Sequence, residues 1–197
     1  MVAKLLITEQ DGTPQQIVFG NHAGDYNPTA ANDLRISTDG SNETDVELVL
    51  LDLADGAAAQ SAKVDLGANR AEEYAVRACI EMQVAVADAG SVVELYWSPS
   101  HHATAANGNA GGCSGSASAY TGYSADLADS IKQLQFLGVL TMTDDAVDSV
   151  QIGEVGILRT RERYGSLVVK NEVGQVICDT DDIEAHIVFD PIIPESQ

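Results

Sequence analysis

The thirteen residues YAVRACIEMQVAV, positions 74–86, alternate between apolar side chains and a mixed, partly polar set. The apolar side of the pattern holds Tyr74, Val76, Ala78, Ile80, Met82, Val84 and Val86. Because successive residues of a strand point to opposite faces of a sheet, this alternation predicts a long strand with one face in a core. A turn at 88–91 and a second alternating stretch at 92–97 follow. We expect the two stretches to form an antiparallel hairpin.

Similar short patterns extend in both directions along the chain. They predict strands at 5–7, 16–19, 45–53, 131–142, 150–158, 167–169, 175–178 and 184–189. Residues 171–174 are typical of a hairpin turn between two of these strands, and the in-strand glycines Gly153 and Gly156 indicate a bulge or a close backbone approach. We expect a turn or one helical turn at 55–61, and a short helical turn over 124–129 with Ser124 as its cap.

Many strands with little helix between them favour an all-β fold. We predict an antiparallel β-sandwich, jelly-roll-like, with long loops and an extended N-terminal segment. Residues 54–197 are expected to form the β-sandwich domain. Residues 1–53 are expected to supply N-terminal strands or an arm, either separate from the sandwich or part of it, and the Asn-, Asp-, Gly- and Thr-rich residues 20–44 are typical of a loop or arm.

The charge of the chain excludes two classes of partner. Thirty acidic residues stand against ten lysines and arginines, a formal charge of −20 over 197 residues. Such a chain repels nucleic-acid phosphates and anionic membrane surfaces, so we expect neither as a partner. The sequence also lacks an apolar run of the ~20 residues that a membrane-spanning helix needs.

The residue types used in catalysis and metal binding do not form a recognisable site. Cys79, Cys113 and Cys178 lie too far apart for a zinc motif or a disulfide framework. Cys113 shares the Gly-, Ala- and Ser-rich loop 98–123 with two histidines, but such a loop offers no rigid support and no orienting third group. We therefore predict no enzyme and no cofactor. Acidic turns at 144–148 and 179–182 are expected to be solvated surface, with a bound divalent cation as the alternative.

Loop 98–123 and its aromatic neighbours supply candidate contact residues. So long a segment without strand patterning is expected to be held either by its own domain or by a neighbouring subunit. By strand alternation, one of Tyr96 and Trp97 faces inward and the other outward. An outward aromatic residue can anchor a protein partner or stack on a sugar, whereas an inward one packs in the core. The candidate interface residues are Trp97, Tyr120 and Tyr123.

A second candidate contact lies in a short basic stretch. Arg159, Arg161 and Arg163 occupy alternate positions in an otherwise acidic chain. On an extended backbone they would share one side. The spacing predicts either a basic stripe that meets an acidic patch on another subunit, or local pairing with the acidic surface of the same chain.

Four segments resemble structural proteins of tailed bacteriophages. They are ADGAAAQSAKVDLGANRAEEYAVRACIE (54–81), SVVELYWSPS (91–100), NGNAGGCSGSASAYTGYSADLADSIKQLQFLGVL (107–140) and ERYGSLVVKNEVGQVICDTDDIEAHIVFDPI (162–192). The resemblance implies a head decoration (cement) protein, made in the host cytoplasm and bound to the major capsid protein on the virion exterior. It also implies a homo-oligomer, with a trimer favoured, and no catalytic residues. The alternatives are a carbohydrate-binding β-sandwich module of a fibre or spike, which would use Trp97 and nearby tyrosines, and another tail component.

Overall fold

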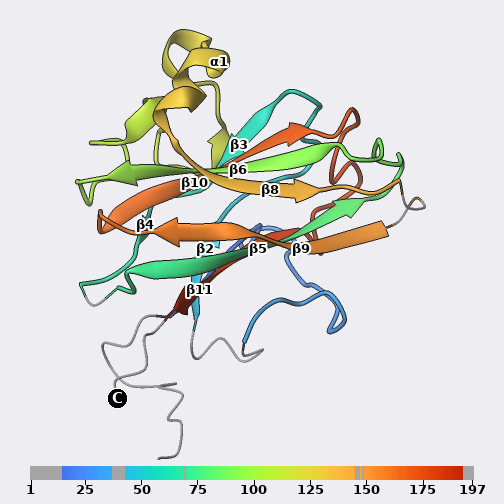
Figure 1. Ribbon diagram of the computed structural model, residues 1–197, viewed down its shortest axis with the longest axis horizontal. Coiled ribbons are helices and arrows are strands. Elements are labelled where there is room, and N and C mark those ends of the chain that lie inside the picture. Colours follow the sequence, from blue (N-terminus) through green and yellow to red (C-terminus); the bar gives the residue numbers. More distant parts are fainter. Residues whose placement is uncertain (1–14, 37–42, 69, 145–146, 148, 193–197) are drawn as a thin grey trace, which may run out of the picture.

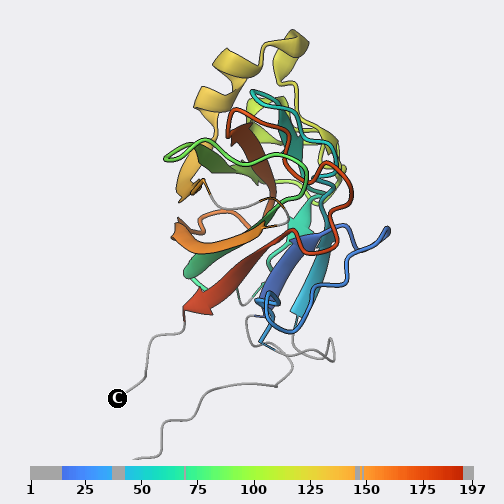
Figure 2. The same cartoon turned by 90° about the vertical axis from the view of Figure 1, so that its right-hand side faces the viewer.

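The computed structural model describes residues 15–36, 43–68, 70–144, 147 and 149–192. Its strands form two facing sheets, so the predicted β-sandwich is confirmed (Figures 1 and 2). The first sheet has the order β2 (Glu43–Glu47), β1 (Gln16–Gly20), β11 (His186–Ile192), β5 (Glu73–Met82) and β9 (Ser149–Arg159). The second has the order β7 (Ser118–Ala119), β3 (Ala58–Gln60), β10 (Tyr164–Glu172), β6 (Val92–Ser100) and β8 (Gln135–Thr141), and β4 (Val64–Asp65) also pairs with β10.

The strand pairs are antiparallel except for β1 and β2, which run parallel. Because β1 lies between β2 and β11, the described part of the N-terminal 53 residues contributes strands to the first sheet. The strand predicted at 5–7 lies outside the described residues.

The core lies between the sheets and follows the predicted alternation of β5. The residues of β5 that face inward are Tyr74, Val76, Ala78, Ile80 and Met82, all of them at most 1% exposed. Three aromatic rings meet at the centre: Phe189 lies 4.8 Å from Phe19 and 5.7 Å from Trp97, centroid to centroid. Rings from both sheets thus bury large apolar areas against one another, which is the main force that holds a sandwich together.

The hairpin predicted from 74–86 and 92–97 is wrong. β5 belongs to the first sheet and pairs with β11 and β9, whereas β6 belongs to the second sheet and pairs with β10 and β8. The connection between them, residues 83–91, is longer than the two to five residues of most hairpin loops, and it carries the chain from one sheet to the other. The strand also ends at Met82, and Val84 is 68% exposed.

Other local predictions fail where side chains or distant strands decide the structure. Residues 175–178 do not form a hairpin with β10, because Ile177 pairs with Leu53 in an isolated bridge. The short helix α1 (Leu127–Ser130) is capped by the carboxylate of Asp126, which accepts the Asp129 N–H, and not by Ser124. The strand predicted at 131–142 begins later, because residues 131–133 form the 3-10 turn η3 (Ile131–Gln133) before β8. The strand predicted at 45–53 ends at Glu47. The predicted turn at 55–61 contains β3.

Residues 101–134 cover the outer face of the second sheet. They contain η1 (Ala110–Gly112), β7, η2 (Tyr123–Ala125), α1 and η3, and the helical part lies beyond that sheet, away from the first (Figure 1). Their side chains build a second small core on β3 and β10, made by Ala58, Cys113, Tyr120, Ile131, Leu134 and Val168. The long polar loop is therefore held by its own domain. No helix in the described residues is long and apolar enough to cross a membrane.

Candidate functional site

Two of the three aromatic candidates are not on the surface. Trp97 is 2% exposed and packs in the core, and it is the inward member of the Tyr96–Trp97 pair. Tyr120 is 1% exposed, and its hydroxyl donates to the carbonyl oxygen of Gly111 at 2.6 Å. Their prediction as contact residues is wrong, because an interior side chain cannot meet a partner. Tyr123, in η2, is 53% exposed and remains accessible.

The three arginines do not form a stripe, because β9 ends at Arg159 and the chain turns before β10. Arg159 Nε donates to Glu73 Oε1 at 2.9 Å, and Arg163 Nε donates to Asp65 Oδ1 at 2.6 Å. The hydrogen bond from Arg163 also lowers the pKa of the Asp65 carboxyl. Two of the three are thus paired locally, in agreement with the second interpretation of the basic stretch.

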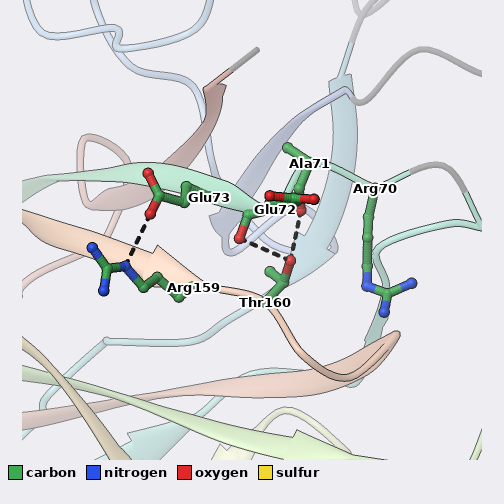
Figure 3. A pocket seen from close by; sticks show the side chains of 6 residues that line it. All are labelled: Arg70, Ala71, Glu72, Glu73, Arg159 and Thr160. Atoms are coloured by element: carbon green, nitrogen blue, oxygen red, sulfur yellow. Dashed lines mark hydrogen bonds and ion pairs between the residues drawn. The ribbon is translucent and has the colours of Figure 1, made fainter. Parts of the chain in front are cut away.

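The same end of the sandwich holds a fourth arginine that sequence reasoning missed. Arg70 Nη2 donates to the backbone carbonyl of Arg161 at 2.8 Å. It also lines a groove of ≈ 490 Å³ with Ala71, Glu72, Glu73, Arg159 and Thr160. Figure 3 shows Arg70 and Arg159 on opposite sides of Thr160, whose hydroxyl donates to the carbonyl of Ala71 at 2.6 Å. Arg70 is far from the other arginines in sequence, so no local pattern signals this grouping.

We call residues 65–73 together with 159–164 the arginine end. Its four arginines are balanced by the four carboxylates of Asp65, Glu72, Glu73 and Glu162, so its formal charge is zero in a chain of charge −20. Among the described residues, neither Arg70 nor Arg161 has a carboxylate partner. A guanidinium binds a carboxylate through two parallel hydrogen bonds, so these groups suit acidic side chains of another protein.

The three thiols lie in the interior of the described part of the chain. All three cysteines are free and buried. Burial raises the pKa of Cys113 to about 11 and also raises the pKa values of Cys79 and Cys178, so the thiols stay protonated at neutral pH. His101, which shares the loop with Cys113, pairs instead with Glu162 at 2.8 Å.

The acidic turn at 179–182 has a structural use. Asp182 is 1% exposed, and its Oδ2 accepts the backbone N–H groups of Leu50 and Leu51 at 3.0 and 3.2 Å. Over the described residues, no group of three or more His, Cys, Asp or Glu side chains is arranged to hold a metal ion. Asp145 and Asp148 of the other acidic turn lie outside those residues.

Comparison of the chain with protein-family models, with curated proteins and with solved structures finds no match.

Proposed function

We propose that this chain is a virion decoration protein of the tailed-bacteriophage type, which binds the outer surface of the head and strengthens it through non-covalent contacts. The sequence segments that resemble phage structural proteins support this assignment. The observation that carries the docking mechanism is the arginine end, an exposed, charge-balanced surface on a strongly acidic molecule. We expect the chain to act as a homo-oligomer, with a trimer favoured, and to contact the major capsid protein.

Electrostatics explains why the arginine end is the contact surface. A molecule of charge −20 is repelled by another acidic surface wherever its own carboxylates face it. The repulsion is reduced at the charge-balanced end, where Arg70 and Arg161 can pair with carboxylates of the partner. The β-sandwich supplies a rigid support, because Arg70 and Arg161 lie next to the ends of β5 and β9.

The test is sedimentation of the purified protein with phage heads that lack it. We expect the wild type to sediment with heads, and the double variant Arg70→Glu/Arg161→Glu to bind on the order of tenfold more weakly. Lys132→Glu is the control, because Lys132 is an exposed cation near α1, away from the arginine end, and it should bind like the wild type.

The outcomes separate the parts of the proposal. Wild-type protein that does not bind heads, or that is absent from purified virions, would overturn the assignment. Binding to tails alone would make the chain a tail component. If the double variant binds heads as tightly as the wild type, the arginine end is not the contact surface. No observation favours the carbohydrate-binding alternative, since Trp97, on which it relied, lies in the core.

A further inference from the structure

Residues 21–36, which we call the strap, cross the outer face of the first sheet without regular secondary structure. Val18 of β1 and Val188 of β11 are paired in register and point away from the sandwich core, yet both are 0% exposed. The ring of Tyr26 lies so close to β1 that a Cβ on Gly20 would come within 2.9 Å of it. The strap is thus a fitted cover for an apolar part of the sheet.

Leu34 ties the strap to three strands through its backbone. Its N–H donates to Nε2 of His186 at 3.0 Å, and its carbonyl accepts from Nε2 of Gln16 at 3.2 Å and from Nη2 of Arg77 at 3.1 Å. Earlier in the strap, the N–H of Thr29 donates to the carboxylate of Glu184 at 3.0 Å. His186 is the one titratable imidazole among these anchors.

The two hydrogen bonds of His186 define its protonation state. Nδ1 lies 2.7 Å from the carbonyl oxygen of Glu184, which can only accept, so Nδ1 carries the hydrogen. Nε2 accepts the N–H of Leu34 and must therefore be free of a proton. A second proton, on Nε2, would face another N–H inside a site that is 0% exposed. The closed strap therefore requires the neutral ring.

Burial of the ring favours its neutral form and outweighs the opposing effect of the groups that face it. The strap places Tyr26 5.5 Å from the ring, centroid to centroid, and also contributes Asp33 and Arg35; Cys79 of β5 is opposite in register. Burial, the largest effect, lowers the pKa of His186, and Arg35 adds to the lowering, while Glu184 and Asp33 oppose it.

We propose that the strap is a proton-operated latch, which is closed while His186 is neutral and detaches when the ring takes up a proton. Once the strap has opened, the ring is solvated and regains an ordinary pKa of about 6.5. The open form therefore binds protons more readily than the closed form, and opening increases as the pH falls below that value, by up to about tenfold per pH unit. Opening uncovers Val18 and Val188. This inference does not depend on the proposed function.

The test follows hydrogen exchange of the Leu34 amide from pH 8 to pH 5, corrected for the intrinsic exchange rate, together with the NMR titration of the His186 ring. We expect the protection of Leu34 to fall below pH ~6.5 by close to tenfold per pH unit, while the amide of Val76 in the core strand β5 keeps its protection. In His186→Gln, a side-chain oxygen can accept from Leu34 but takes up no proton, so the pH dependence should disappear.

His22→Gln is the matched control. His22 also lies in the strap, but both of its ring nitrogens face acceptors: Nε2 lies 3.1 Å from the carbonyl oxygen of Val18 and Nδ1 lies 3.7 Å from Asp45 Oδ1. Among the described residues, no N–H group faces this ring, so the variant should keep the wild-type pH dependence. Constant wild-type protection between pH 8 and 5, or a slope that persists in His186→Gln, would overturn the latch. If His186→Gln does not fold, the test uses the wild type alone. A pH dependence of Leu34 amide exchange that differs from the NMR titration of the His186 ring would then contradict the proposal.

Discussion

One ammonium group organises the start of the insertion that covers the second sheet. Lys63 Nζ lies 2.9 Å from the hydroxyl oxygen of Ser100 and 2.8–2.9 Å from the backbone carbonyl oxygens of His102, Thr104 and Asn107, so its three N–H donors are shared among four acceptors. Four oxygen atoms thus converge on one cation, one from Ser100 at the end of β6 and three from the segment without regular secondary structure between β6 and η1. The segment reads HHATAANGN (101–109), with few large apolar residues to hold it, and Lys63 explains why it adopts a defined path.

Lys63→Met should therefore destabilise the protein through this segment. Hydrogen bonds to a charged donor contribute more than neutral ones, and we expect the free energy of unfolding to fall by about 2 kcal/mol. Urea denaturation measures the loss, and hydrogen exchange of residues 101–109 should increase selectively. Lys132→Met removes a cation whose only ion pair in the described residues is exposed, with Asp129, and should leave stability unchanged. Equal effects of the two variants would contradict this role.

Glu81 is a carboxylate that destabilises the folded state at neutral pH. Burial, with repulsion from Asp181 and Glu184, raises its pKa to about 7. The folded protein thus binds a proton that the unfolded chain releases, so this group adds stability as the pH falls from about 7 towards 4.5 and loses it as the pH rises. Glu81→Gln should be more stable than the wild type at pH 8 and nearly equal at pH 5. A stability difference that is the same at both pH values would refute the assignment.

At the scale of elements, the two sheets meet along β8 and β9, and glycines permit this contact. A Cβ on Gly156 of β9 would lie 2.3 Å from the backbone carbonyl oxygen of Leu137 in β8. Near the same point, the register between β5 and β9 shifts between Val76 and Arg77, so β9 carries a bulge. The bulge and the close approach predicted from Gly153 and Gly156 are both present.

Gly156→Ala should force β8 and β9 apart, because the obstructing atom belongs to the backbone and cannot rotate away. We expect a loss of about 3 kcal/mol in the free energy of unfolding, measured by urea denaturation. Gly153→Ala, on the same strand, is the control: its Cβ would meet only the Cδ1 atom of Leu140, at 2.7 Å, and that side chain can move. An equal loss in the free energy of unfolding for Gly153→Ala and Gly156→Ala would contradict the role of Gly156 in the contact between β8 and β9.

At the scale of the whole molecule, the charge of −20 opposes folding. Compaction brings like charges together, and salt screens their repulsion. Raising NaCl from 10 to 300 mM should therefore increase the free energy of unfolding, by on the order of 1 kcal/mol. CaCl₂ at matched ionic strength should have the same effect, because screening depends on ionic strength. A decrease in stability with NaCl would contradict the argument, and a larger effect of calcium would indicate a cation site.

Predictions from local patterns succeeded where one residue and its neighbours decide the outcome. The inward face of β5 from Tyr74 to Met82 follows directly from its alternation. The candidate site was harder to predict from the sequence. The basic stretch identified Arg159 and Arg163, but nothing in it indicated that they pair with Glu73 and Asp65. Arg70 had no local signal, because its place beside Arg161 depends on two chain segments that meet only in the folded protein.

By itself, the sequence determined that this chain forms strands with one buried face, because period-two alternation is a property of neighbouring residues. It also determined the net charge of −20, because charge is additive along the chain. Only the tertiary structure decided that β5 and β6 lie in opposite sheets, that Trp97 is interior and that His186 accepts a hydrogen bond from the strap. Each of these depends on a partner remote in the sequence, and backbone hydrogen bonds between strands carry almost no side-chain signature of which strands will pair.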